Sequence, residues 1–282
     1  MKPLTKKDKQ LLVMCFVFLI GSIVAMYYVK SIMADDPAFH PKPLTDEDIK
    51  KYSNDDLKAV IIYPILTQYA YQKNGFYDFY SGKCSTCTTV SLKPYGINAS
   101  YNIGKNSFDY LTKLSYPFIT DLTVDRHPNI LKDYDEIILL HNEYMTQNEF
   151  NAIKNHTNVV YLYPNSMYAK VSVDYNNWSM TLLRGHGYPE KNITNGFNYV
   201  TTSQYEYDVN CKNYFWKSRP NGIGLSCWPE YLITYDRNIL QTLLDYPDKV
   251  PSLKTTTSNF SDIRYCERDG SCNKTLDSVL SK

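Results

Sequence analysis

The sequence predicts an α/β fold in which helices cover both faces of a parallel sheet. Short apolar runs and helical patterns alternate from residue 57 to residue 163, as they do where helices connect parallel strands. The run at 136–140 is largely apolar on consecutive positions, which is typical of a strand buried on both faces. Before this region, residues 11–29 have the pattern of a membrane-spanning helix.

The first half of the predicted sheet has signals for two strands and a helix. The first strand is the apolar run 57–63, which leads into a loop rich in aromatic residues at 64–77. Apolar residues spaced by three positions within 108–114 indicate a helix. Residues 117–120 then have the composition of the next strand.

The central strand at 136–140 is followed by a helix with a clear start signal. Thr146 can cap this helix, and Glu149 stands three residues later, which is the spacing of a capping box. Another strand is predicted at 159–163. Residues 171–235 are rich in tyrosine and interrupted by glycine, so we expect mostly strand and loop there.

A late helix and a polar tail complete the predicted organisation. Asp236 is a suitable N-cap for a helix with four apolar residues between positions 239 and 244. The α/β domain is therefore predicted at 56–250. The polar tail at 251–282 is compatible with closure by a disulfide.

The N-terminal region predicts a single-pass membrane anchor. Residues 11–29 are long enough, since about 20 apolar residues span a bilayer. Lysines gather in residues 1–10, which the positive-inside rule assigns to the cytoplasm, leaving the main domain extracellular at the cell membrane. Residues 30–55 are polar and contain prolines, as a stalk would. A cleaved signal peptide is the alternative, but its apolar core would usually be shorter.

Cysteines and glycosylation sequons agree with an extracellular domain. Six cysteines lie outside the membrane run, an even number that suggests disulfides. Proximity in sequence favours the pairs Cys84–Cys87, Cys211–Cys227 and Cys266–Cys272, although a redox role for the first pair stays open. The candidate glycosylation sites are Asn98, Asn155, Asn177, Asn192, Asn259 and Asn273.

The amino-acid composition argues against nucleic acid as a partner. The formal net charge is +1, from 30 basic and 29 acidic side chains, so there is no basic surplus for nucleic-acid binding. The chain has 27 tyrosines against 11 phenylalanines. Tyrosine combines an apolar ring with a hydroxyl that can stay hydrated or bind a cation, so aromatic packing and phenolate ligands are both expected uses.

Candidate catalytic residues follow the central strand. His141 and Glu143 come directly after it, at the edge where open α/β sheets bind ligands. A nucleophile elbow is not apparent, and Ser166 lacks the flanking glycines of such a turn, so covalent catalysis is disfavoured. His141, Glu143 and the distant His186 have the residue types of a two-histidine, one-carboxylate iron site.

Four short motifs also carry a family resemblance. The stretch 141–146 is similar to a His-Asp-Glu-Tyr-Trp-Ser motif, and 164–171 to a Gly-Asn-Thr motif followed by an aromatic residue and Gln-Val. Upstream, 67–77 is similar to Thr-Trp-Gln-Ala-Tyr-Asn followed by glycine and an aromatic residue, and 91–95 to Ser-Leu-x-Arg-Pro-Tyr. In this order the motifs resemble the C-terminal domain of the N,N-dimethylformamidase large (beta) subunit family.

The resemblance implies a fold, a cofactor and a reaction. The fold would be flavodoxin-like, of the class I glutamine-amidotransferase-like superfamily. A mononuclear ferric iron would be held by Tyr71, Tyr95 and Glu143, with His141 and Asn165 beside the substrate. Two phenolates and a carboxylate would neutralise the ferric ion, which would act as a Lewis acid in hydrolysis of the C–N amide bond of a small substrate. His141 would shuttle the proton and Asn165 would orient or polarise the carbonyl group.

Two other functions remain open at this point. One is a non-catalytic surface glycoprotein that keeps the fold and binds a partner, as a homo-oligomer or in an envelope assembly. The other is an iron oxygenase that uses His141, Glu143 and His186 as ligands.

Overall fold

The computed structural model describes residues 43–53, 58–93, 104–199 and 214–246, together with positions 20, 22, 208 and 211. The chain divides into two compact units, Met1–Lys42 and Pro43–Lys282, and the fold described here is that of the second unit. Among the described residues, no helix has the length and apolar character needed to cross a bilayer. Of the predicted span at 11–29, only Ile20 and Ser22 are described.

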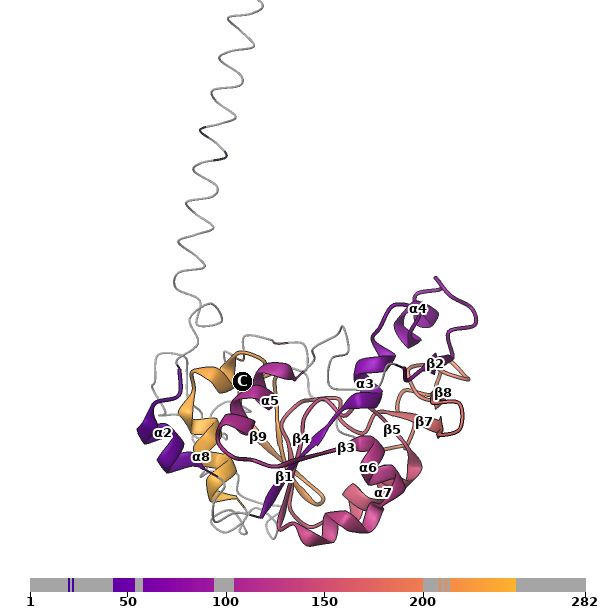
Figure 1. Ribbon diagram of the computed structural model, residues 1–282. Helices are drawn as coiled ribbons and strands as arrows, with labels where there is room; N and C mark the ends of the chain where they lie inside the picture. Colours follow the sequence, from indigo (N-terminus) through magenta and orange to yellow (C-terminus); the bar gives the residue numbers. More distant parts are fainter. Residues whose placement is uncertain are drawn as a thin grey trace, which may run out of the picture. The chain divides into compact units, whose positions relative to one another are not determined.

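A six-stranded, mostly parallel sheet forms the centre of this unit (Figure 1). Its strand order is β3-β1-β4-β6-β10-β9, and every neighbouring pair is parallel except β10 and β9. The parallel sheet expected from the alternating pattern is therefore confirmed. In chain order the strands are β1 (Ala59–Tyr63), β3 (Phe118–Thr120), β4 (Glu136–Leu139), β6 (Val159–Tyr161), β9 (Trp216–Arg219) and β10 (Gly222–Leu225).

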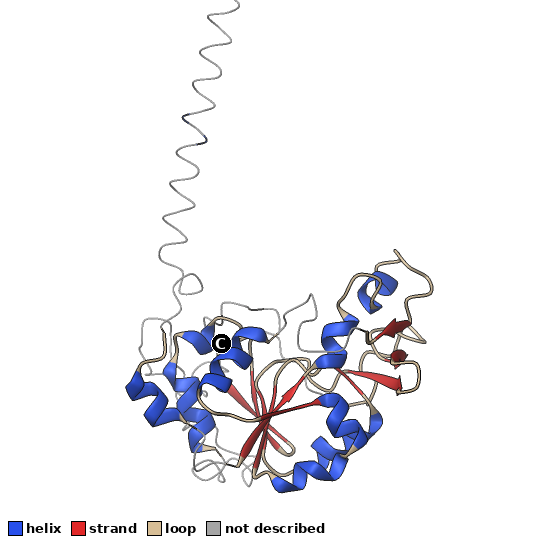
Figure 2. Cartoon of the chain, in the orientation of Figure 1, coloured by secondary structure: helices blue, strands red, loops and turns tan. Residues whose placement is uncertain are grey.

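Helices cover both faces of the sheet, as predicted (Figure 2). Alternate residues of each strand point to opposite faces, so the same strands supply two separate cores. Ile61 and Ile138 belong to one core with α5 (Lys105–Lys113), the 3-10 helix η3 (Leu232–Thr234) and α8 (Arg237–Asp245). The other core joins the sheet to α6 (Asp121–Arg126), the 3-10 helix η2 (Pro128–Asp133) and α7 (Gln147–Asn155).

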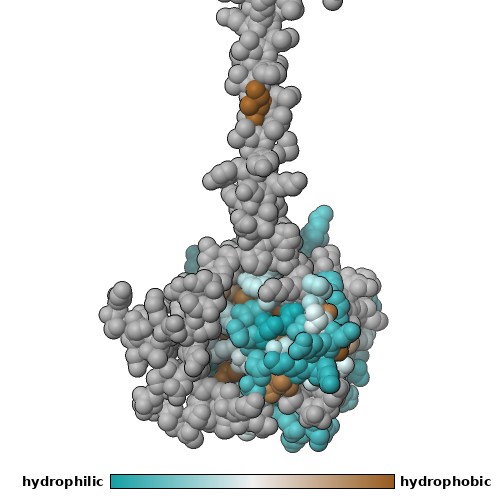
Figure 3. All heavy atoms as spheres, turned by 90° about the vertical axis from the view of Figure 1, so that its left-hand side faces the viewer, coloured by the Kyte–Doolittle hydropathy of each residue, from teal (hydrophilic) through white to brown (hydrophobic). Residues whose placement is uncertain are grey.

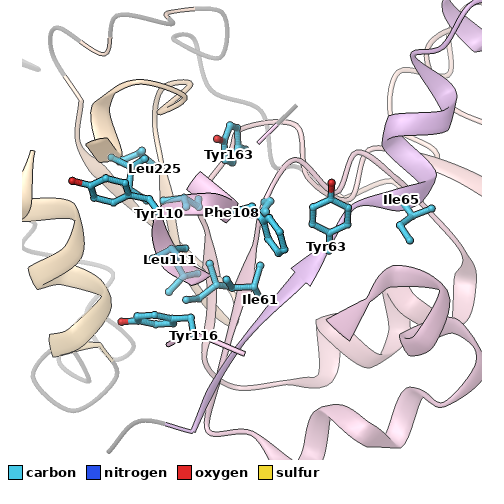
Figure 4. Packing of buried hydrophobic residues seen from close by; sticks show 14 of the residues in the cluster. Ile61, Tyr63, Ile65, Phe108, Tyr110, Leu111, Tyr116, Tyr163 and Leu225 are labelled. Atoms are coloured by element: carbon cyan, nitrogen blue, oxygen red, sulfur yellow. The ribbon is translucent and has the colours of Figure 1, made fainter. Parts of the chain in front are cut away.

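Aromatic side chains dominate the first of these cores. Figure 4 shows Phe108 of α5 beside Tyr63 of β1, with Ile61 and Leu111 toward the other side of its ring. The rings of Tyr63 and Phe108 meet edge to face with centroids 4.5 Å apart, a geometry that aromatic pairs prefer. This core holds α5 against the strand that leads into the candidate site.

A second, four-stranded sheet adjoins the carboxyl edge of the first. Its order is β2-β8-β7-β5, with β5 and β7 parallel and the other pairs antiparallel. The strands are β2 (Thr89–Ser91), β5 (Tyr144–Met145), β7 (Ala169–Asp174) and β8 (Ser179–Arg184). Because β5 begins directly after Glu143, this sheet is continuous with the segment that carries the predicted site residues.

Three local predictions differ from the structure. The aromatic loop expected at 64–77 contains two short helices, α3 (Ile65–Ala70) and α4 (Phe76–Tyr80). A short strand that the sequence did not predict, β5, lies between the central strand and the helix that Thr146 caps. Its capping box is also incomplete: the Thr146 hydroxyl accepts the Glu149 N–H at 3.2 Å, but no bond returns from the Glu149 carboxyl, which is buried without a partner in the described structure.

The described part of the predicted stalk is folded. Residues 46–52 form α2 (Asp46–Tyr52), where Thr45 and Asp48 make a complete capping box. Arg237 of α8 donates two hydrogen bonds to the Asp48 carboxylate, at 3.0 and 2.9 Å, and Tyr52 is buried. The folded unit therefore includes residues that the sequence assigned to the stalk.

Two of the three expected disulfides are present. Cys84 is bonded to Cys87, and Cys211 to Cys227. Cys266, Cys272 and the whole tail at 251–282 lie outside the described residues.

Three of the six sequons can be placed on the structure. Asn155, Asn177 and Asn192 are exposed, as an acceptor must be, and the surface turned to the viewer in Figure 3 is mostly hydrophilic over the described residues. Asn98, Asn259 and Asn273 lie outside the described residues. Glycosylation itself stays a prediction.

Candidate functional site

Glu143 is fixed by backbone contacts from two directions. Its side chain is almost fully buried. Its backbone N–H and that of Tyr144 both donate to the Thr67 hydroxyl of α3, at 3.0 and 3.1 Å. Its backbone carbonyl accepts the N–H of Tyr168, which follows the turn after β6, at 3.0 Å. Segments that follow β1, β4 and β6 therefore meet at Glu143, on the carboxyl edge of the sheet.

Four side chains surround the Glu143 carboxylate. The Tyr71 hydroxyl donates to Oε2 at 2.7 Å, and the Tyr77 hydroxyl donates to Oε1 at 3.3 Å. Nε2 of His186 lies 2.5 Å from Oε1, and Nε2 of His141 lies 3.4 Å from Oε2. Burial by itself raises the pKa of Glu143, but the His186 hydrogen bond and the nearby His141 outweigh it and lower this pKa below its ordinary value. Glu143 is therefore a carboxylate at neutral pH.

Tyr71 and Tyr77 form a stacked pair of phenols beside this carboxylate. Their ring centroids are 4.0 Å apart and their hydroxyl oxygens 2.5 Å apart. Burial raises the pKa of both phenols, and the negative charge of Glu143 raises it further. Both are consequently neutral without a cation. A metal ion at these oxygens would reverse the electrostatic contribution, because a positive charge favours the phenolate.

His141 is a buried, neutral imidazole. It has no solvent exposure, and burial lowers its pKa to about 4 despite the opposing charge of Glu143. The Trp228 indole packs edge to face against its ring, with centroids 4.4 Å apart. Neither ring nitrogen has a hydrogen-bond partner within the described residues. Such an unpaired buried group is costly unless it serves a ligand or a proton transfer.

Asn165 lies on the turn that follows β6. It adopts a left-handed backbone conformation with φ of 63°, which asparagine tolerates better than most residues. The turn is held against the Glu143 segment by the bond from the Met167 N–H to the Asn142 carbonyl, at 2.8 Å. Oδ1 of Asn165 is buried and lacks a hydrogen-bond partner in the part of the chain that is described. Next to it, the Ser166 hydroxyl donates to backbone carbonyls, which is a structural role.

His186 is brought to Glu143 by an unusual loop. It follows β8 and has a φ of 52°, between Gly185 with φ of 130° and Gly187 with φ of 77°. Three consecutive residues with positive φ are accessible here because two of them are glycines. A Cβ at Gly185 would also lie 3.0 Å from Ala169. The backbone thus turns tightly and brings the His186 imidazole next to Oε1 of Glu143.

The structure brings together four of the five residues expected at the site, or the segments that carry them. Tyr71 and His141 both lie against the Glu143 carboxylate, and the turn with Asn165 is bonded to the Glu143 segment. Tyr95 lies outside the described residues. Sequence reasoning did not single out Tyr77, which is one of many tyrosines.

The sequence predicts His186 at the site only for the alternative two-histidine, one-carboxylate iron centre, and not for the site implied by the family resemblance. The signal that could have distinguished it is the Gly-His-Gly triplet, because paired glycines permit a backbone turn that aims the side chain between them.

The donor atoms fit an ion that prefers oxygen. In the described part of the chain, no group of three or more His, Cys, Asp and Glu side chains is arranged to hold a metal ion. His141 and His186 both lie against the Glu143 carboxylate itself. The Tyr71 oxygen and Glu143 Oε2 are 2.7 Å apart, close to the spacing of adjacent oxygens in an octahedron with metal–oxygen distances of about 2.0–2.1 Å. A site built on phenols and one carboxylate therefore fits the geometry better than a histidine-based one.

Comparison with known proteins identifies no relative: no family model matches the sequence, and no curated protein sequence matches it.

Proposed function

We propose that the chain is a membrane-anchored, extracellular, iron-dependent amidohydrolase that cleaves the C–N amide bond of a small substrate. The observation that carries the proposal is the contact of the Tyr71 phenol with the Glu143 carboxylate at 2.7 Å, beside His141. Tyr71 and Glu143 would hold the ferric ion, with Tyr95 as the further ligand that the family resemblance implies. When bound, the ion supplies Lewis-acid polarisation of the substrate and lowers the pKa of water.

His141 is suited to proton transfer in this reaction. With its pKa lowered to about 4, the imidazole is neutral at physiological pH and can accept a proton. Nε2 would take the proton of the attacking water and later return it to the nitrogen of the leaving amine. His141 is fully buried, so access to it requires movement of covering side chains such as Trp228.

Asn165 is suited to bind the substrate carbonyl. The turn that carries its side-chain amide is bonded to the Glu143 segment, and the buried acceptor atom Oδ1 has no hydrogen-bond partner among the described residues. The N–H of this amide would donate to the carbonyl oxygen, where negative charge develops as water attacks the carbon.

The cellular location and the detailed fold type are part of the same proposal. The apolar run at 11–29 and the preceding lysines support an N-terminal anchor with a cytoplasmic N-terminus, and the two disulfides support an oxidising compartment. The central parallel order and the ligand cluster at the strand ends support the flavodoxin-like, glutamine-amidotransferase-like architecture.

One observation favours the non-catalytic alternative. The Glu143 carboxylate is satisfied by protein groups alone, and His141 is sealed from solvent. A hydrogen-bonded network of this kind can rigidify a surface glycoprotein without taking part in any reaction.

A metal titration of the full-length chain in detergent separates the two functions. The proposed enzyme binds ferric ion with a tyrosinate-to-iron charge-transfer band and then releases amine from a panel of small amides. Tyr71→Phe and Glu143→Gln should each weaken the band and reduce the activity, because each removes an oxygen that would bind the ion. Tyr134→Phe is the matched control, since Tyr134 lies at the opposite end of β4. A wild-type chain that shows neither band nor amine release supports the glycoprotein alternative.

A further inference from the structure

A phenol that no motif singled out belongs to the cluster around the Glu143 carboxylate. The Tyr77 hydroxyl is 2.5 Å from the Tyr71 hydroxyl and 3.3 Å from Oε1 of Glu143. Together with the 2.7 Å contact of Tyr71 and Oε2, three oxygen-bearing side chains meet at one point. Tyr77 is also the outermost of the three, with 36% of its surface exposed.

Specific local features place Tyr77 there. Its helix α4 starts at Gly75, where a Cβ would lie 2.3 Å from the Ala70 carbonyl oxygen, so only glycine allows α4 to begin directly against the end of α3. The Asp78 carboxylate accepts the Asn74 N–H at 2.7 Å. The Asp78 carbonyl accepts the Cys84 N–H at 3.1 Å, which ties α4 to the loop closed by the disulfide.

The three distances, two of which end on different oxygens of Glu143, lie within about half an ångström of the oxygen–oxygen spacing in an octahedral site. Adjacent oxygens of an octahedral ion with metal–oxygen distances of about 2.0–2.1 Å lie about 2.8–3.0 Å apart. The observed separations of 2.5, 2.7 and 3.3 Å fall on either side of this value. One ion could therefore contact all three groups after shifts of a few tenths of an ångström.

We propose that Tyr77 supplies the second phenolate of the metal site, in the position that the family resemblance gives to Tyr95. This inference rests on the proposed iron site and changes its ligand set to Tyr71, Tyr77 and Glu143. Two phenolates and one carboxylate carry three negative charges, which balance a trivalent cation. Each phenol releases one proton when its oxygen binds the ion, whereas Glu143 is already ionised, so two protons leave per ion bound.

The test is a ferric citrate titration of the full-length chain with three tyrosine variants and a control. Tyr77→Phe keeps the stacked ring and removes only the oxygen. We expect it to weaken ferric binding roughly ten- to hundredfold, to reduce the charge-transfer band by about half, and to release one proton instead of two. Tyr71→Phe should behave similarly. Tyr95→Phe and the control Tyr134→Phe should match the wild type in affinity, band and proton count.

The opposite results overturn the inference in distinguishable ways. Wild-type binding in Tyr77→Phe with loss in Tyr95→Phe would assign the second phenolate to Tyr95 and leave the proposed function standing. Absence of a band in the wild-type chain would remove the iron site and this inference together. Gallium(III) provides a second measurement, because its binding produces a tyrosinate ultraviolet signal that counts the phenolates without requiring activity or iron redox chemistry.

Discussion

At the scale of single residues, His186 shows how one side chain can orient another. Its Nε2 lies on Oε1 of Glu143, so that Oε2 faces Tyr71 and His141. The rings of Tyr168 and Tyr144 lie beside the imidazole, with centroids 4.5 and 5.7 Å away. We therefore interpret His186 as a positioning residue for the carboxylate.

Substitution of His186 should weaken the metal site without unfolding the protein. His186→Ala removes the bond to Oε1 and should reduce ferric affinity roughly ten- to hundredfold. His186→Gln retains an N–H donor and should recover part of this loss. Ferric titration followed by the charge-transfer band measures both. The exposed His127→Ala is the control, and equal affinities in all four proteins would show that His186 does not position Glu143.

At the scale of elements, the contact between α6 and α7 buries three carboxyl groups. Asp121 accepts the N–H groups of Leu66 and Leu122, at 2.7 and 2.8 Å. Asp125 accepts the Thr146 hydroxyl at 2.6 Å. Glu149 has no partner for either oxygen within the described structure. Burial raises the pKa of Asp121 to about 8, and the nearby Asp125 adds to this rise. Burial also raises the pKa of Glu149 well above its ordinary value, with repulsion from Asp121 and Asp125 adding to the effect.

The raised pKa values predict that stability falls as the pH rises. Between about pH 4 and about pH 8 the folded state retains protons that the unfolded chain releases, so the free energy of unfolding decreases through this window. Glu149→Gln removes one of these titrating protons, so the free energy of unfolding should depend less on pH. Near the upper end of the pH window the variant should be more stable than the wild type by about 1–3 kcal/mol. Chemical denaturation at several pH values measures this. Glu190→Gln, at an exposed position, should leave the profile unchanged; a wild-type profile that rises with pH would contradict the prediction.

At the scale of the molecule, hydrogen bonds between charged side chains and a disulfide join parts of the chain that are distant in sequence. Arg237 connects α8 to Asp48, 189 residues earlier in the sequence, and this hydrogen bond lowers the pKa of Asp48 to about 2. The Cys211–Cys227 disulfide encloses the segment that contains β9 and β10. It also precedes Trp228, the residue that packs on His141.

The two disulfides should contribute unequally to stability. Cys211 and Cys227 are 16 residues apart, and closing a loop of this length stabilises by about 3 kcal/mol in the chain-entropy model. Cys84 and Cys87 are 3 residues apart, for which the same model gives about 2 kcal/mol. Denaturation of the two double Cys→Ala variants compares them. A larger loss from the Cys84–Cys87 pair would show that strain or packing, rather than loop length, decides the contribution.

Local sequence patterns determined the parallel sheet, most of its helices and the two described disulfide pairs. The short apolar runs at 57–63 and 136–140 mark buried strands of the sheet. Thr146 and Asp236 cap the helices that follow them, because these signals depend on neighbours a few residues away. The positions of His141 and Glu143 after the central strand were determined in the same way.

Only the tertiary structure decided which side chains meet at Glu143. Tyr77 and His186 come from segments 66 and 43 residues away in sequence, and their approach depends on Gly75 packing on α3 and on the left-handed turn at 185–187. The incomplete capping box at Glu149 has the same origin, because burial beside Asp121 and Asp125 outweighs a local hydrogen bond. Contacts across such distances depend on how whole segments pack, and no local pattern encodes that packing.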